Sequence, residues 1–391
     1  MAAFFIYLLT RAKLLPYIKH TLTFLFVMLI AGTAAAALTD LITQKSVAPI
    51  PEAVSNNAVT SVVVGDQQYI LSFSGLGKGK KAPNVHNRTY IFNVQDNTWK
   101  RGKDVPIQAP VISIDDSGEE HRLFGRLASV ATSIGKHAYV FGGYTVGYDH
   151  TEVSIPDVYK YAVDTDTFTQ MSPMPVPVDD SIALTYQSRY IYLFSGWHND
   201  GNVNLVQVFD TQRDTWQQAS PFPGRPVFGH AGGIVDDTIV ICDGVSVKYY
   251  ANKRRSFTAE PACFIGKIST DNPNKIDWRT LAHPTGKARY RMAAYGDVER
   301  QQLMFVGGSD NPYNYNGIGY NGEPSTADGS VWIYDIHKNT WSVKAGNLET
   351  MDHRGLIKLS QKDKNNFATI GGMNSQQEVL NTVNIHFEQS K

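Results

Sequence analysis

The chain has 391 residues, with 36 Lys and Arg against 36 Asp and Glu, so its formal net charge at pH 7 is zero. A balanced charge gives no electrostatic case for a nucleic-acid partner or a membrane surface. Aromatic residues make up 11% of the chain and there are 32 glycines. Such a composition suits many short strands joined by tight turns, and an array of repeats can close into one domain of this length.

The N-terminal segment has the pattern of a secretory signal. Arg11, Lys13 and Lys19 precede an apolar run over residues 21–37 that ends in four alanines. This is the order of a signal peptide, with the cleavage site after the small residues. We expect residues 1–37 to be a signal peptide and residues 38–391 to form the mature, periplasmic or secreted protein. An uncleaved membrane anchor is the alternative, because the apolar run is at the short limit for spanning a bilayer.

The chain contains two cysteines, Cys242 and Cys263. Export would permit a disulfide between them, and two buried free thiols are the alternative. No histidine spacing converges on them, so the sequence predicts neither a metal site nor a cofactor.

Self-comparison reveals six repeats. In each, a β-rich apolar run ends in a pair of small residues: Ser74-Gly75, Gly142-Gly143, Ser195-Gly196, Asp243-Gly244, Gly307-Gly308 and Gly371-Gly372. In four repeats a later pair of aromatic residues is separated by six positions with turn formers between them: Phe92 and Trp99, Tyr161 and Phe168, Phe209 and Trp216, Tyr334 and Trp341. These features indicate strands with a tight turn between each aromatic pair.

This pattern resembles the Kelch repeat and covers nearly all of the predicted mature chain. The resemblance implies an all-β fold, a six-bladed Kelch β-propeller of four-stranded antiparallel blades. The fourth repeat departs from the pattern, with Asp243 in place of a small residue, and the sixth stops one strand short. We expect the segment around residues 47–54 to supply that strand and close the ring.

Propeller topology predicts that the turns entering the innermost strands and the loops after the glycine pairs open on one face. The entering turns carry polar groups in every repeat: Asn56, Asn57, Arg126, Asp179, Asp180, His230, Arg289, Arg291, His353 and Arg354. Together they suggest a site for an anionic or polyol ligand at the pore mouth. The alternative is that each side chain binds backbone carbonyls between blades.

The loops after the glycine pairs are rich in tyrosine, asparagine and other polar groups. Residues 144–152 and 197–200 contain Tyr144, Glu152, Trp197 and His198, and residues 309–323 contain Asn311 and Tyr313 among other Tyr and Asn residues. Aromatic faces beside amide groups suit sugar rings, which stack on one face and form hydrogen bonds around the rim. A loop packed over its own blade is the alternative. Residues 253–255, Lys-Arg-Arg, are expected to form a solvated turn.

Two exported Kelch enzyme groups offer functional analogies. Galactose oxidase needs a Cys crosslinked to a Tyr at its copper site, whereas Cys242 occupies a core strand position here, so copper oxidase chemistry is not expected. The bacterial N-acetylneuraminate epimerase group is similar in the segment from Phe305 through Asn311 to Gly317. Its acid–base Glu lies in the fourth blade, and the corresponding residues 244–250 here contain no Glu.

The sequence therefore predicts an exported, monomeric propeller that binds a small molecule or glycan. Sugar epimerase or mutarotase activity is a further hypothesis, and a non-catalytic propeller for protein–protein interaction is the alternative. The candidate catalytic residues are Asp180, His230 and Glu323. The candidate ligand contacts are Arg126, Arg291, Arg354, Trp197, His198, Tyr144, Asn311 and Tyr313.

Overall fold

The structure is a computed structural model that describes residues 47–360 and 366–387. The predicted signal segment, residues 1–37, lies outside these ranges. The chain divides into two compact units, Met1–Val47 and Ala48–Lys391, and the second contains every strand described below. Within the described ranges, no helix is long and apolar enough to cross a membrane.

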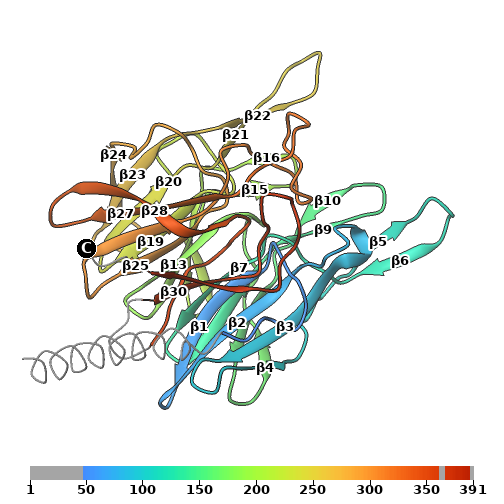
Figure 1. Ribbon diagram of the computed structural model, residues 1–391, viewed down its shortest axis with the longest axis horizontal. Helices are drawn as coiled ribbons and strands as arrows, with labels where there is room; N and C mark the ends of the chain where they lie inside the picture. Colours follow the sequence, from blue (N-terminus) through green and yellow to red (C-terminus); the bar gives the residue numbers. More distant parts are fainter. Residues whose placement is uncertain (1–46, 361–365, 388–391) are drawn as a thin grey trace, which may run out of the picture. The chain divides into compact units, whose positions relative to one another are not determined.

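The second unit is a six-bladed β-propeller, as predicted (Figure 1). The innermost strands are β1 (Ala58–Val64), β7 (Val130–Ile134), β13 (Ile182–Tyr186), β19 (Ala231–Val235), β25 (Ala293–Asp297) and β29 (Ile357–Lys358). The second strands are β2 (Gln67–Leu76), β8 (His137–Phe141), β14 (Tyr190–Phe194), β20 (Thr238–Cys242), β26 (Gln302–Val306) and β30 (Asn366–Ile370).

The third and fourth strands complete the antiparallel blades. The third strands are β3 (Val85–Asn93), β11 (Val158–Ala162), β17 (Val206–Asp210), β23 (Cys263–Ile268), β27 (Asp328–Asp335) and β31 (Val383–Phe387). The fourth strands are β4 (Thr98–Arg101), β12 (Thr167–Gln170), β18 (Thr215–Gln218), β24 (Ile276–Leu281) and β28 (Thr340–Thr350). Within the described residues the sixth blade has three strands.

In five blades the small-residue pair directly follows the second strand, because both positions require a left-handed backbone. In the first blade Ser74-Gly75 lies within β2, at a shift in the pairing with β3. All twelve residues of the six pairs have positive φ, from 52° at Gly142 and Ser195 to 122° at Gly75. The second position also excludes a side chain: a Cβ on Gly143 would lie 2.6 Å from the Leu127 carbonyl oxygen. Glycine meets both demands without strain.

The spaced aromatic residues face each other across the outer two strands of a blade. Phe92 pairs with Trp99, Tyr161 with Phe168, Phe209 with Trp216 and Tyr334 with Trp341, with ring centroids 4.5–5.0 Å apart. In the fourth blade Trp278 pairs with Gly266 instead, and the indole ring occupies the space that a side chain at Gly266 would need. Cross-strand aromatic contacts of this kind stabilise a sheet.

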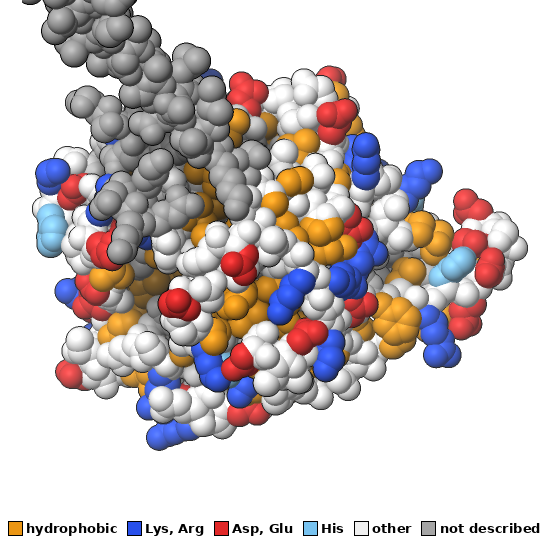
Figure 2. Space-filling model, turned by 60° about the horizontal axis from the view of Figure 1, so that its bottom comes forward, with side chains coloured by type: hydrophobic (Ala, Val, Ile, Leu, Met, Phe, Trp, Pro, Cys, Tyr) orange, Lys and Arg blue, Asp and Glu red, His pale blue; other side chains and the backbone are white. Residues whose placement is uncertain are grey.

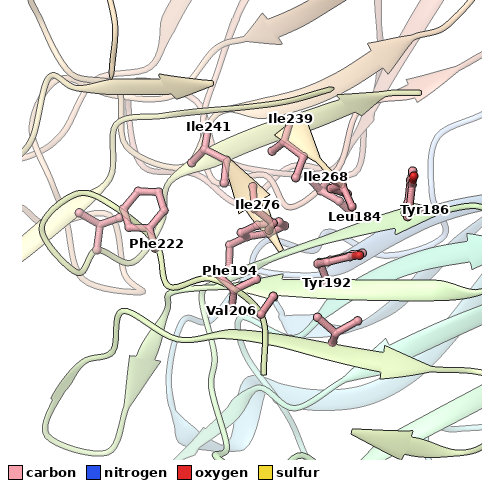
Figure 3. Packing of buried hydrophobic residues seen from close by; sticks show 13 residues of the cluster. Leu184, Tyr186, Tyr192, Phe194, Val206, Phe222, Ile239, Ile241, Ile268 and Ile276 are labelled. Atoms are coloured by element: carbon pink, nitrogen blue, oxygen red, sulfur yellow. The ribbon is translucent and has the colours of Figure 1, made fainter. Parts of the chain in front are cut away.

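The hydrophobic core lies between blades rather than within one. Figure 3 shows one such cluster, in which Tyr192 and Phe194 of the third blade meet Ile239, Ile241 and other side chains of the fourth. A single sheet cannot bury both of its faces, so each blade depends on its neighbours.

A disulfide joins Cys242 and Cys263, which are directly opposite each other on β20 and β23. Both cysteines are fully buried. The structure therefore favours the disulfide over the two free thiols.

Residues 50–54 contact residues 380–381 of the sixth blade, but not as an added strand. The Ile50 amide donates to the Asn381 carbonyl at 3.0 Å, and the Val54 amide donates to the Leu380 carbonyl at 3.0 Å. Residues 47–54 contain no strand. The predicted segment thus closes the ring, whereas its prediction as a strand is wrong.

Short hairpins extend the blades on one face, here called the hairpin face. They are β5 (Val111–Ile114) with β6 (Glu120–Leu123), β9 (Tyr144–Val146) with β10 (Glu152–Ser154), β15 (Trp197–His198) with β16 (Gly201–Asn202), and β21 (Val245–Lys248) with β22 (Ser256–Ala259). In every blade a bridge joins the entering turn to the residue after the glycine pair, as between Asp179 and Trp197. The predicted convergence of these turns and loops is confirmed.

Candidate functional site

One residue from each blade lies on the hairpin face where the innermost strand begins. These six residues, here called the axial ring, all have positive φ values between 49° and 71°: Asn56, Ala128, Asp180, Gly229, Arg291 and Asp352. Backbone amides connect successive members; for example, Asp180 donates to Ala128 and Gly229 donates to Asp180. Non-glycine residues seldom adopt this conformation, so the ring is held in place by the surrounding structure.

The side chains of the axial ring form a buried network of charges. Arg291 Nη2 lies 2.6 Å from Asp180 Oδ2, and Arg291 Nη1 lies 3.1 Å from Asp352 Oδ1. Arg354 Nη2 lies 2.8 Å from Asp180 Oδ1. Asn56 donates to Asp352 Oδ2 at 2.7 Å and accepts from Arg354. The four charged side chains are at most 3% exposed, so this network is a plug across the propeller axis.

The plug keeps Asp180 ionised. Burial opposes ionisation of Asp180, but Arg291 and Arg354 outweigh it and hold the pKa of this carboxyl below its usual value. The Arg291 guanidinium also lies beneath the rings of Tyr290 and Tyr313, at 4.6 and 5.2 Å from their centroids. The Arg291 guanidinium and the Asp180 carboxylate therefore bind each other through charge-assisted hydrogen bonds.

Above the plug, on the hairpin face, lies a cavity of about 640 Å³, here called the face cavity. Four blades line it, with Tyr144, His150, Thr151, Glu152, Asp179, Asp180, Trp197, Asn199, Asp200, Phe228, Arg254, Arg255, Phe257, Arg291, Asn314, Tyr315 and Tyr320. A second space of about 360 Å³ lies among the innermost strands and is lined by His230 and Arg354 among others. Asp180 and Arg291 of the plug reach the first space, and Arg354 reaches the second.

Stacked rings form one wall of the face cavity. Phe257 of β22 and Tyr320 of the loop between β26 and β27 stack with centroids 3.8 Å apart. The Arg255 guanidinium lies 4.8 Å from the Trp197 ring and 5.8 Å from the Phe257 ring. The Trp197 indole donates to the Asn199 carbonyl, which fixes the orientation of its ring. Residues 253–255, predicted as a solvated turn, therefore contribute Arg254 and Arg255 to the cavity.

Two of the other carboxyl groups that line the cavity have raised pKa values. Burial raises the pKa of Asp179 well above its usual range, although the Ser154 hydroxyl donates to its Oδ2 at 2.6 Å. Burial also raises the pKa of Glu152, and the charges of Arg255 and Arg291 partly oppose that effect. Displaced carboxyl pKa values in a cleft are typical of functional sites.

The predicted site residues separate into two groups. The face cavity brings together Asp180, Arg291, Trp197 and Tyr144. The others lie outside it, namely His230, Glu323, Arg126, Arg354, His198, Asn311 and Tyr313.

Of the candidate catalytic residues, Asp180 lines the face cavity, whereas His230 and Glu323 lie outside it. His230 faces the inner space, where burial lowers its pKa to about 4, and Glu323 is exposed on its loop. Asn311 donates within the same loop, to Asn321 and the Glu323 carbonyl.

The remaining predicted residues have partners within the fold. Arg126 donates to the Gly125 carbonyl and to Thr145, and burial lowers its pKa to about 10. A ring nitrogen of His198 bonds to the Pro177 carbonyl. Tyr313 is fully buried against the plug. Sequence reasoning did not select Glu152, Arg255 or Tyr320, although Glu152 stands in a polar loop directly after a glycine pair.

Residues 58–264, more than half of the chain, match the family model of the KLHDC2/KLHL20/DRC7 Kelch-repeats domain. The chain belongs to the Kelch-repeat family. The predicted Kelch resemblance is thereby confirmed.

Two curated Kelch proteins are similar to part of the chain. Kelch-like protein terF of Aspergillus terreus is 26% identical over 196 residues, which are 48% of this chain and 40% of the relative. A Kelch repeat-containing protein of Dictyostelium discoideum is 28% identical over 81 residues, 20% of this chain and 12% of the relative. The chain thus spans less than half the length of these curated relatives.

A solved structure, that of YjhT, has a similar fold. It superposes with a TM-score of 0.62 at 16% identity, covering 86% of this chain and 98% of that one. At this identity the likeness concerns the Kelch fold alone.

Proposed function

We propose that the face cavity binds a small polar ligand, a carbohydrate. The observation that carries this proposal is the juxtaposition of a stacked aromatic wall, Phe257 with Tyr320, and carboxyl groups in a cavity of about 640 Å³. Cavities that bind small molecules commonly enclose about 300–1,000 Å³. Aromatic rings bind the apolar face of a sugar, and carboxylates accept its hydroxyl hydrogen bonds.

Thermal-shift measurements with galactose, glucose, N-acetylglucosamine, glucuronic acid and N-acetylneuraminic acid test this proposal. A sugar that binds the folded protein raises the melting temperature, and the rise grows with the logarithm of one plus the ratio of the sugar concentration to Kd. Phe257→Leu keeps an apolar side chain but removes the stacked ring, and we expect it to weaken the shift. Phe124→Leu, which changes an exposed ring directly after β6, is the matched control. The proposal fails if no sugar shifts the wild type, or if both variants respond equally.

We further propose that the protein catalyses anomer exchange of the bound sugar. This exchange needs one group that donates a proton to the ring oxygen and a second group that takes the proton of the anomeric hydroxyl, so that the ring C–O bond breaks and a carbonyl forms. Closing the ring on the other face of the carbonyl returns both protons. Asp179 has a raised pKa and supplies the donor, and Glu152 supplies the acceptor. Exchange spectroscopy by NMR on any sugar that binds measures this activity. If the bound sugar exchanges anomers only at the uncatalysed rate, the protein binds the sugar without catalysing anomer exchange.

A second candidate function is docking of a partner protein. The β5–β6 hairpin presents Ile112 and Ile114, and Phe124 directly follows β6; their side chains are 49%, 61% and 46% exposed. The hairpin projects from the blades in Figure 1, and acidic side chains gather on the lobe that projects on the same side in Figure 2. Exposed apolar side chains at a rim are typical of interaction surfaces. Recovery of the same partner by wild type but not by an Ile112→Ser, Ile114→Ser variant would support docking.

A further inference from the structure

Four carboxyl groups line the face cavity, those of Glu152, Asp179, Asp180 and Asp200, and three of them have partners in the protein. Asp200 Oδ1 lies 4.0 Å from Arg255 Nη1. Asp180 is held by Arg291 and Arg354, and Asp179 accepts a hydrogen bond from Ser154. Glu152 differs: among residues 47–360 and 366–387, no side chain or backbone group forms a hydrogen bond or ion pair with its carboxylate. Its two oxygens can therefore accept hydrogen bonds from a ligand in the face cavity.

Glu152 lies in a position where an unpartnered carboxylate is costly. It is partly buried on β10, opposite Val146 of β9, so the backbone pairing fixes where its side chain begins. Arg255 is held against Trp197 and Phe257 and lies beyond ion-pair distance of Glu152. The Glu152 oxygens stay accessible from the cavity, but partial burial removes solvation from the ionised carboxylate and raises its pKa. Such costs are retained chiefly where function requires them.

We infer that Glu152 is the carboxylate that recognises the ligand of the face cavity, and that it selects ligands presenting hydrogen-bond donors, either adjacent hydroxyl groups or an ammonium group. This inference rests on the proposed function, since it names the group that recognises the sugar. An ionised carboxylate accepts through two oxygens and donates nothing. Two adjacent hydroxyls can each donate to one oxygen, as can two N–H bonds of an ammonium group. A ligand that turns only acceptors or negative charge toward Glu152 is excluded by repulsion.

The first experiment needs no ligand and uses the full chain. Melting temperatures of wild type and Glu152→Gln are compared between pH 4 and pH 8, with Glu120→Gln, an exposed glutamate on β6, as control. Because burial raises the pKa of Glu152, its ionisation costs stability once pH rises above the ordinary carboxyl range. Glu152→Gln should therefore melt at a higher temperature than wild type at pH 8 and at the same temperature at pH 4. A lower melting temperature at pH 8 would mean that Glu152 has a structural partner, and would overturn the inference.

The second experiment measures binding at pH 7 with two kinds of donor: neutral sugars (galactose, glucose, N-acetylglucosamine) and amines that are not sugars (ethanolamine, Tris). Hydrogen bonds to a charged group contribute enough that Glu152→Gln should weaken binding about tenfold or more, and Glu120→Gln should not. Sugars that bind wild type but not Glu152→Gln support both proposals. Sugars that bind both equally support the cavity as a sugar site and overturn the role of Glu152. Glu152-dependent binding of amines alone supports Glu152 and overturns the carbohydrate function, and binding of neither class overturns both.

Discussion

At the scale of single residues, the plug shows why charged groups near a pore are ambiguous in a sequence. Arg291 and Arg354 were predicted as ligand contacts and Asp180 as a catalytic residue, and in the fold Asp180 forms ion pairs with both arginines. A buried arginine is satisfied only by several acceptors in a fixed geometry. Which arginine finds such partners depends on the axial ring, whose members come from different blades. One sequence does not show that convergence.

Asp180→Asn should destabilise the propeller by about 3 kcal/mol at pH 7, because it leaves Arg291 and Arg354 with Asp352 as their remaining carboxylate partner. The pKa of Asp180 is lowered in the fold, so its contribution is present above the ordinary carboxyl pKa and is lost as pH falls through the lowered value. Urea unfolding at pH 7 and pH 3 should give a large gap between wild type and variant at pH 7 and a smaller one at pH 3. A gap independent of pH would contradict this account of Asp180.

At the scale of elements, the repeats predicted the strand ends because the backbone imposes the same demand six times. Both residues of each pair have positive φ, and glycine or another small or short polar side chain tolerates it. The β5–β6 hairpin was not predicted, because it belongs to one blade and self-comparison finds only what recurs. Glu152 was named in its polar loop but was not selected as a site residue, because nothing in the repeat distinguishes it from its neighbours. The repeat pattern identifies the strands of the propeller, whereas the candidate site consists of residues that differ from one blade to the next.

The departure of the fourth blade from the repeat has a structural cause. Asp243 Oδ2 accepts from the Arg289 amide at 2.7 Å, and Asp243 Oδ1 lies 2.7 Å from His283 Nε2. His283 Nδ1 accepts from the Gly286 amide, so Nε2 carries the proton and donates to Asp243. Asp243 thereby ties the end of β20 to the segment that leads into the fifth blade.

Asp243→Gly therefore tests whether the repeat pattern alone sets stability. Glycine would relieve the left-handed backbone, by about 1 kcal/mol, but would remove two buried hydrogen bonds to a carboxylate, which contribute about 1.5–3 kcal/mol each. We expect a net loss of about 2 kcal/mol or more in urea unfolding. Asp243→Asn, which keeps the acceptor oxygen, should lose less. Equal or greater stability of Asp243→Gly would show that the pattern outweighs these bonds.

At the scale of the whole molecule, the sequence predicted which residues close the ring, but the prediction that they form a strand was wrong. The Ile50 amide binds Asn381 as the Met174 amide binds Pro156 in the second blade, where Met174 follows the fourth strand β12. Residues 48–54 thus correspond to the connection after a fourth strand. The position that corresponds to β12 itself precedes Val47, outside the described residues. The sixth repeat combines two segments that lie far apart in the sequence, so it has no continuous copy to align with the other repeats. The predicted strand was therefore misplaced.

Ile50→Ala tests whether this connection belongs to the cooperative unit of the propeller. Ile50 is fully buried, and its amide holds the connection to the sixth blade. Removing a buried isoleucine side chain typically costs about 2–5 kcal/mol. Val63→Ala on β1, where the side chain is 51% exposed, is the control, and we expect its cost to stay within about 0.5 kcal/mol. Urea unfolding followed by tryptophan fluorescence should show a single transition that moves to lower urea for Ile50→Ala with an unchanged slope, because a propeller closed through this connection unfolds as one unit. If Ile50→Ala unfolds like Val63→Ala, then the five blades with four strands hold the ring without the N-terminal connection, and closure contributes nothing to stability.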